Sequence, residues 1–239
     1  MYDVGTFQLM RHLTVPDHAK VSLLTDMASC EYALCVYISD RNGACIYVFD
    51  VKVEAFTQWG VGDIPNGLSV NASHNVLVTC GRKRVIKEFS SRGELIRRVP
   101  LPSDVIHPWQ TIQSLNNGYV VCHGEAGDAV HGVCKISADD RHIVHSHGSR
   151  PGPSSGQCHV PVRLALDNDG FVFVADFSNR RVRLLSPTLG HVRDVVSRDH
   201  LKWYPTRLCL DVQRGRLYVA DNEWGGGMVV SGRVVVFSV

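Results

Sequence analysis

Two hydrophobic runs in the second half of the chain end in the same three residues, and this repetition limits the possible folds more than any other feature. The run "VFVAD" ends at Asp176 and the run "LYVAD" ends at Asp221. A short apolar run, "RLALD" or "RLCLD", precedes each of them, and a turn with a further apolar run follows. Alternation of apolar and polar residues with a period of two predicts β-strands, and recurring groups of strands predict a repeat protein.

The same pattern occurs three more times upstream. Its equivalent positions are Asp40, Cys80, His123, Asp176 and Asp221, which are separated by 40, 43, 53 and 45 residues. A spacing of about 40–45 residues is the length of one four-stranded propeller blade. We therefore predict an all-β chain with almost no helix, folded as a single β-propeller domain over residues 1–239. Its five blades of antiparallel strands cover approximately residues 14–59, 60–102, 103–150, 151–200, and 201–239 together with 1–13.

The two ends of the chain complete this pattern. The C-terminal run "GRVVVFSV" is the third strand of the last unit, whereas "GTFQLMRHL" near the N-terminus has the features of a lone fourth strand. Pairing of these two runs would close the ring and remove two exposed sheet edges. A six-bladed ring is the alternative, if the chain lacks one blade.

Composition excludes several classes of protein. The net charge is +2, from 25 basic and 23 acidic side chains, which is too small to predict a polyanionic partner, and DNA is not expected. No apolar run is long enough to span a membrane, and the N-terminal residues lack the order of a signal peptide. No pair of cysteines has the C-x-x-C spacing, so we expect reduced thiols in a soluble cytoplasmic protein. The eight cysteines are Cys30, Cys35, Cys45, Cys80, Cys122, Cys134, Cys158 and Cys209.

The fourth unit, "GQCHVPVRLALDNDGFVFVADFSNRRVRLLSP", resembles an NHL repeat. It has the proline before the first strand, Asp-Gly at the first turn, Val-Ala-Asp, and then Asn-x-Arg-Val. The fifth unit resembles it less closely, because a glycine-rich insertion replaces the Asn-Arg-Val turn. The resemblance implies a propeller that binds RNA or protein, as in the tripartite-motif family, although NHL propellers usually have six blades. No RING, B-box or coiled coil precedes the repeat, so ubiquitin ligation is not implied.

Three aspartates occupy the repeated position at the end of the second strand. Asp40, Asp176 and Asp221 each precede a tight turn, where a carboxylate can accept hydrogen bonds from backbone N–H groups. We interpret them as structural braces rather than as catalytic groups or metal ligands, because the repeat spreads them around a ring.

Basic side chains follow this position and are expected on one face of the disc. They are Arg41, Arg82, Lys83, Arg84, Arg180 and Arg181. Side chains on loops over a rigid scaffold often bind partners, whereas the alternative is a solvated turn. The equivalent loop of the third blade holds Glu125 and Asp128 and interrupts the basic charge. Trp224, within "NEWGGG", is a further candidate for binding, whereas Trp59 and Trp109 are expected to pack between blades.

Two arginines are predicted at the mouth of the central channel. Arg163 and Arg207 follow proline by two residues at the start of the innermost strands, where the other blades have Gly67 and Gln110. Two neighbouring guanidinium groups suit a carboxylate or phosphate of a ligand. The alternative is that each arginine pairs with an acidic residue of a neighbouring blade.

No known catalytic or cofactor motif occurs in the chain. His142, His145 and His147 lie close together, but a converging set of metal ligands is lacking, and we expect no metal and no cofactor. The first hypothesis is therefore a non-enzymatic propeller that binds an acidic protein or peptide through its basic loops and channel mouth. Single-stranded RNA is the second candidate ligand, and an enzyme that acts on a small anionic substrate is the third hypothesis.

Overall fold

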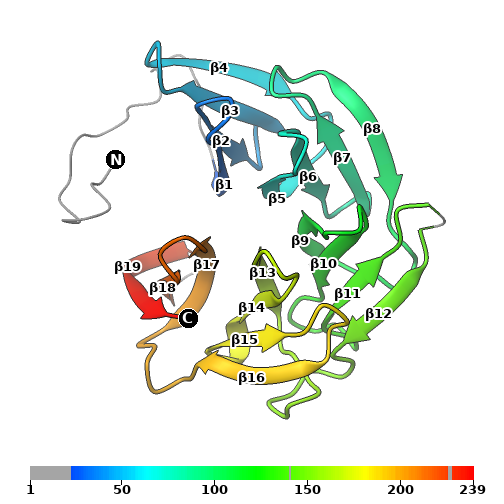
Figure 1. Ribbon diagram of the computed structural model, residues 1–239, viewed down its shortest axis with the longest axis vertical. Helices are drawn as coiled ribbons and strands as arrows, with labels where there is room; N and C mark the ends of the chain where they lie inside the picture. The colour runs from blue at the N-terminus through cyan, green and yellow to red at the C-terminus, as the bar shows by residue number, and fades with distance from the viewer. Residues whose placement is uncertain (1–22, 140, 226–227) are drawn as a thin grey trace.

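Five small antiparallel sheets surround a common axis in the computed structural model, and Figure 1 shows them in a view down that axis. The structure describes residues 23–139, 141–225 and 228–239. Each sheet consists of consecutive strands paired in chain order, with its first strand nearest the axis. The prediction of an all-β propeller with five blades is confirmed. The chain therefore forms a ring of sheets, in which loops gather at the two ends of the axis.

The first four sheets contain four strands each, and three strands of the fifth sheet are described. The strands are β1 (Leu24–Cys30), β2 (Cys35–Asp40), β3 (Cys45–Asp50), β4 (Ala55–Gly60), β5 (Pro65–Val70), β6 (Val76–Cys80), β7 (Val85–Phe89), β8 (Leu95–Pro100), β9 (Pro108–Gln113), β10 (Tyr119–His123), β11 (Gly132–Ile136), β12 (Ile143–His147), β13 (Pro161–Leu166), β14 (Val172–Asp176), β15 (Arg181–Leu185), β16 (His191–Val196), β17 (Tyr204–Asp211), β18 (Arg216–Gly225) and β19 (Met228–Ser238). A short 3₁₀ turn, η1 (Phe177–Asn179), is the one helical element of the described residues.

The hydrophobic core is divided among the junctions between neighbouring sheets. Leu77 and Ile86 of the second sheet pack against Tyr119 and Val121 of the third, and similar clusters join the first sheet to the second, the third to the fourth, and the fourth to the fifth. The second strands β6, β10 and β14 are buried along their whole length, because each sheet is covered on both faces. Burial on both faces explains why these strands are apolar runs such as "VLVTC" and "YVVCH".

The predicted fourth strand of the fifth blade, in residues 1–13, lies outside the described residues. Among the described strands, β17 and β1 connect the fifth sheet to the first. Within the described part of the chain, Arg207 of β17 reaches the carbonyl of Thr25 and the carboxylate of Asp26 in β1. No described helix has the length and apolarity that a membrane span needs.

Candidate active site at the channel mouth

Each innermost strand has the same irregularity, and it defines a ring of five equivalent residues. The pairing of β1, β5, β9, β13 and β17 with the second strand of the blade shifts by one residue near the start of the strand. A β-bulge of this kind redirects the side chain that follows it. The residues that follow the shift form what we call the inner ring: Asp26, Gly67, Gln110, Arg163 and Arg207.

Asp26 is the residue of the inner ring that sequence reasoning missed. Its position is detectable, because Asp26 precedes Asp40 by 14 residues, and Arg207 precedes Asp221 by the same number. The carboxylate is buried, and its Oδ1 atom lies 3.3 Å from Arg163 Nε and 3.2 Å from Arg207 Nε. Its Oδ2 atom accepts a hydrogen bond of 2.8 Å from the backbone N–H of Leu68 in the next blade. One carboxylate thus joins the first, second, fourth and fifth blades.

The two predicted arginines meet at this carboxylate but differ in exposure. The side chain of Arg163 is 5% exposed, whereas that of Arg207 is 42% exposed. Arg163 also donates to the carbonyl groups of Val162 at 2.7 Å and Thr25 at 3.1 Å. Arg163 is therefore a buried structural cation that crosses the channel, whereas the side chain of Arg207 is partly exposed.

Arg207 is held in place while it stays partly exposed. It donates to the carbonyl of Thr206 at 2.6 Å and to that of Thr25, in addition to its contact with Asp26. Burial, together with the neighbouring charge of Arg163, lowers the pKa of Arg207 to about 10, although Asp26 acts in the opposite direction. The guanidinium group stays charged at neutral pH. Two guanidinium groups and one carboxylate leave one net positive charge in this cluster.

Gln110 links the innermost strands of three blades. Its Nε2 atom donates to the carbonyl of Leu68 at 2.9 Å, and its Oε1 atom accepts from the N–H of Leu164 at 2.8 Å. These backbone groups face the channel and have no further strand to pair with. The amide of Gln110 is therefore occupied by structural hydrogen bonds. Gly67 lies against Gln110, where an added Cβ would approach the carbonyl of Trp109 to 2.3 Å.

The three repeated aspartates accept hydrogen bonds from the loops beside them. Asp40 accepts from the N–H groups of Leu23, Asn42 and Gly43. Asp176 accepts from the N–H of His159, and from the side chains of Asn179 and Arg181. Asp221 accepts from the N–H groups of Lys202 and Trp203 and from Arg233. In the fourth and fifth blades the carboxylate thus holds the loop that enters the blade.

Two of the predicted binding arginines are used inside the molecule. Arg180 donates to the carbonyls of Leu201, Lys202 and Trp203 at 2.6 to 2.9 Å. Arg181 is buried and donates to the carboxylate of Asp176 at 2.7 Å and to backbone carbonyls of residues 153–157. These contacts correct the expectation that both side chains project from the loop face, because carbonyl groups of neighbouring loops occupy the guanidinium donors.

The other predicted loop residues stay at the surface. Arg82, Lys83 and Arg84 are exposed, and Arg41 is half-buried. Arg84 donates to the carbonyl of Ser103 at 3.0 Å, and Lys83 donates to that of Gly62 at 3.4 Å. The side chain of Trp224 lies outside the described part of the chain. The loop face thus combines exposed basic residues on the second blade with internally bonded ones on the fourth.

A histidine and an aspartate form a pair on the same face, and sequence reasoning did not identify it as a unit. His107, in the loop before β9, approaches Asp128 Oδ2 with its Nδ1 atom at 2.8 Å, and the N–H of Glu125 donates to the same oxygen at 2.7 Å. The side chain of His107 is 51% exposed. The hydrogen bond to Asp128, with the nearby charge of Glu125, raises the pKa of His107, and the pKa of Asp128 is lowered. The 21-residue separation of the two side chains gives no local motif.

The described residues contain no group of three or more histidine, cysteine or acidic side chains able to hold a metal ion. Of the three clustered histidines, His147 is buried against Arg183, whereas His142 and His145 are exposed. All eight cysteines are free thiols. Burial raises the pKa of several of them, Cys80, Cys122 and Cys134 among them, which keeps them protonated.

No protein-family model matches this chain, and no curated protein sequence does so. The solved structures that it resembles include a streptogramin B lyase, with a TM-score of 0.63 and 16% identity over 90% of this chain and 68% of that one. A luciferin-regenerating enzyme has a TM-score of 0.62 and 16% identity, covering 83% of this chain and 69% of that one. Hydrazine synthase of Kuenenia stuttgartiensis has a TM-score of 0.67 and 13% identity, covering 100% of this chain and 88% of that one.

These similarities establish the β-propeller fold, and they correct one prediction. A non-enzymatic binding module was expected, because no catalytic motif stands out from the repeat. The similar solved propellers are named as a lyase, a regenerating enzyme and a synthase, so the prediction of a non-enzymatic module is wrong. In a propeller, side chains from different blades can form a site without any local motif, as the inner ring illustrates. The NHL-like repeat stays a resemblance of the fourth unit.

Proposed function

We propose that this propeller is an enzyme that acts on a small organic anion at the mouth of its channel. The observation that carries the proposal is Arg207, a cation at the channel mouth that is held by two blades and yet is 42% exposed. A guanidinium group that is fixed before the ligand arrives loses little rotamer entropy on binding, and it can hold a carboxylate or phosphate through two N–H groups. The fold is shared with proteins named as enzymes, which supports a catalytic use of this site.

Arg163 and Asp26 have positioning roles in this proposal. Arg163 is buried, and its hydrogen bonds go to backbone carbonyls and to Asp26, so it contributes charge rather than direct contacts. Asp26 neutralises one of the two guanidinium groups and fixes the orientation of both. The remaining positive charge favours an anionic substrate over a neutral one.

The pair of His107 and Asp128 supplies the proton-transfer group. When Asp128 accepts a hydrogen bond from Nδ1–H, the Nε2 atom of His107, which lies 3.5 Å from Glu125 Oε1, is the atom that takes a proton from a substrate or from water. His107 lies on the loop face, as does the channel mouth, and more than half of its side chain is exposed. The proposed reaction is therefore general-base chemistry on an anion, either elimination or hydrolysis.

The test is a turnover screen of the purified protein with small carboxylates, phosphate esters and lactones. Protein variants are then assayed with a compound that is turned over. Arg207→Met is expected to raise KM by about tenfold or more, because it removes a charge-assisted contact with the substrate. His107→Gln is expected to lower kcat by about 10²–10⁴-fold. Exposed Arg150 serves as a matched control, since Arg150→Met leaves both sites intact.

The pH profile gives an independent readout of the base. A general base works only when it is deprotonated, so kcat/KM should fall as the pH falls through the raised pKa of His107. Asp128→Asn removes the carboxylate that raises this pKa and should move the midpoint to lower pH. The proposal fails if no compound is turned over, or if the profile and rates of the His107→Gln and Arg207→Met variants equal those of the parent.

A further inference from the structure

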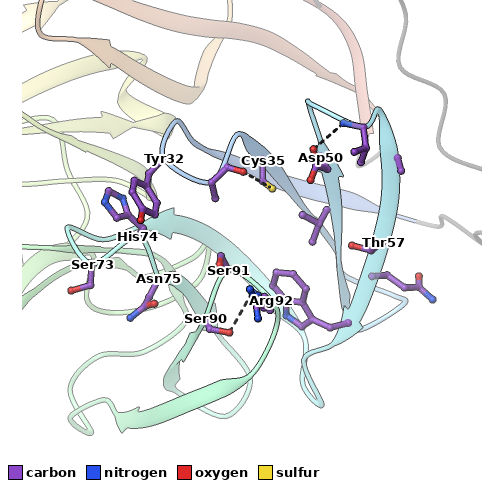
Figure 2. A pocket seen from close by; sticks show the side chains of 16 residues that line it. Tyr32, Cys35, Asp50, Thr57, Ser73, His74, Asn75, Ser90, Ser91 and Arg92 are labelled. Carbon is purple, nitrogen blue, oxygen red and sulfur yellow. Dashed lines mark hydrogen bonds between the residues drawn. The ribbon is translucent and has the colours of Figure 1, made fainter.

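A pocket of about 680 Å³ opens between the first two sheets, at the end of the strands opposite to the channel mouth. The turns that join β1 to β2, β3 to β4, β5 to β6, and β7 to β8 contribute to its lining, and Figure 2 shows these side chains. Its volume lies within the range of about 300–1,000 Å³ that is usual for small-molecule sites. The pocket shares no residue with the inner ring or with the pair of His107 and Asp128.

Aromatic and apolar side chains form the walls of this pocket. Val48, Ala55 and Trp59 are among the lining residues, and Tyr32 stacks on His74 with ring centroids 4.3 Å apart. The indole of Trp59 is fixed, because it packs edge-on against Tyr37 and lies so close to Gly93 that an added Cβ would be 2.6 Å from the ring. These walls suit the hydrophobic part of a ligand.

One polar atom in the wall lacks the partner that it needs. The Nε1–H group of Trp59 is buried and has no hydrogen-bond acceptor among the described residues. A buried donor without an acceptor is unfavourable, so such a group calls for a bound water or ligand. An occupant of the pocket that offers a carbonyl or carboxylate oxygen would supply the missing acceptor.

Two opposite charges complete the lining. The Oδ1 atom of Asp50 accepts hydrogen bonds from the N–H groups of Lys52 and Val53, and its Oδ2 atom makes no hydrogen bond or ion pair with the described residues. Arg92 is exposed, and its guanidinium group makes no hydrogen bond or ion pair with the described residues. Figure 2 shows Asp50 and Arg92 on different strands and turns around the same pocket. The thiol of Cys35 is neutral, because burial and the charge of Asp50 raise its pKa, and it donates to the carbonyl of Ala33.

We propose that this pocket binds a small zwitterion of the amino-acid or dipeptide type with a hydrophobic side chain. Asp50 receives the ammonium group, Arg92 receives the carboxylate, and a carbonyl oxygen accepts the hydrogen bond from Trp59. The hydrophobic side chain lies against Val48 and the indole. The single positive and single negative charge of the lining match a zwitterion better than they match a simple anion or cation.

The experiment follows the indole N–H signals of ¹⁵N-labelled full chain by NMR during titration with the dipeptide Ala-Leu. The chain has four tryptophans, and Trp59→Phe identifies the signal of interest by its disappearance. That signal should shift as the dipeptide is added, up to about 10 mM, while the signals of the other tryptophans stay in place. N-acetyl-Ala-Leu and Ala-leucinamide, which lack one charge each, should bind about tenfold more weakly.

Two variants test which charged group of the dipeptide Asp50 and Arg92 each bind. Asp50→Asn keeps the Oδ1 acceptor of the turn, and it should abolish the preference for Ala-Leu over the acetylated form. Arg92→Met should abolish the preference over the amide, whereas Arg98→Met, an exposed arginine of the same blade, should change neither. The proposal is overturned if the Trp59 signal does not move, if all three compounds bind equally, or if the preferences survive in the two variants. None of these outcomes depends on activity at the channel mouth.

Discussion

The turns after β6 and β14 occupy equivalent places in two blades and carry similar charges, but their arginines differ in exposure and in the number of internal hydrogen bonds. In the second blade, Arg82, Lys83 and Arg84 are exposed. In the fourth blade, Arg180 and Arg181 are bonded to backbone carbonyls of other loops. Arg183, two residues after Arg181 in β15, is fully buried and donates to the carbonyls of Ser154, Ser155 and Gln157.

The difference follows from the length of the neighbouring loop. A long connection of residues 148–160 precedes the fourth blade, and its backbone carbonyls have no strand to pair with. Buried carbonyl groups need donors, and the guanidinium groups of Arg181 and Arg183 supply several each. The comparison teaches that the charge of a turn does not by itself indicate a binding surface. The number of unpaired backbone acceptors nearby decides whether arginines turn inward.

Removal of Arg183 should have the largest effect on stability. The guanidinium group bonds to Asp194, His147 and the carbonyls of the long loop, and its side chain is 0% exposed. Arg183→Met should lower the free energy of unfolding by about 3–5 kcal/mol, because it removes a buried cation that donates to Asp194 and to the carbonyls of Ser154, Ser155 and Gln157. Urea denaturation measures this loss. A loss below that of the exposed Arg84→Met variant would contradict the inward role.

Acidification should weaken the contact between the third and fourth blades, where His147 of β12 lies against Arg183. Burial, with the charge of Arg183 beside it, lowers the pKa of His147 to about 4, whereas an unfolded histidine has a pKa of 6.5. The unfolded chain therefore binds more protons as the pH falls below 6.5, and stability is lost in the same direction. This one group accounts for about 2 kcal/mol between pH 7 and pH 5. Urea denaturation at both pH values should show that the free energy of unfolding of His147→Gln changes by about 2 kcal/mol less than that of the parent protein.

Weakening the brace at Asp176 should have an intermediate effect. Asp176→Asn can still accept the N–H of His159 but loses the charge-assisted hydrogen bond from Arg181. We expect a loss of about 1–2 kcal/mol in the free energy of unfolding. A double-mutant cycle with Arg181→Met separates the pair from the other contacts of each residue. Additive losses in that cycle would show that the two side chains do not stabilise each other.

The smallest effect is expected for the exposed turn of the second blade. The double variant Arg82→Met and Arg84→Met should change the free energy of unfolding by less than about 0.5 kcal/mol, because surface substitutions rarely exceed this value. Thermal unfolding beside the parent protein is a sufficient measurement. A loss of several kcal/mol would mean that this turn resembles that of the fourth blade after all.

The repeat made the fold predictable, because five apolar strand groups at nearly constant spacing are compatible with few architectures. The positions of Arg163 and Arg207 were also predictable from their place after proline. Their partner Asp26 and the inward use of Arg181 depend on contacts between blades that are distant in sequence. The pairing of His107 with Asp128 depends on where two loops meet. No local pattern contains that information, since the blades bring such residues together only in the closed arrangement.

The bulge that recurs in every innermost strand has a consequence for how this molecule can vary. It places one residue per blade at the axis while the adjacent residues stay in the ladder. Arg207 is partly exposed, whereas the other four residues are buried, so the five positions differ in how easily they can be exchanged. Aspartate, glycine, glutamine and two arginines already occupy them in one chain. Arg207 is therefore the position at which a combinatorial library disturbs the contacts between blades least, and variation there is expected to give the same scaffold a new small-molecule specificity.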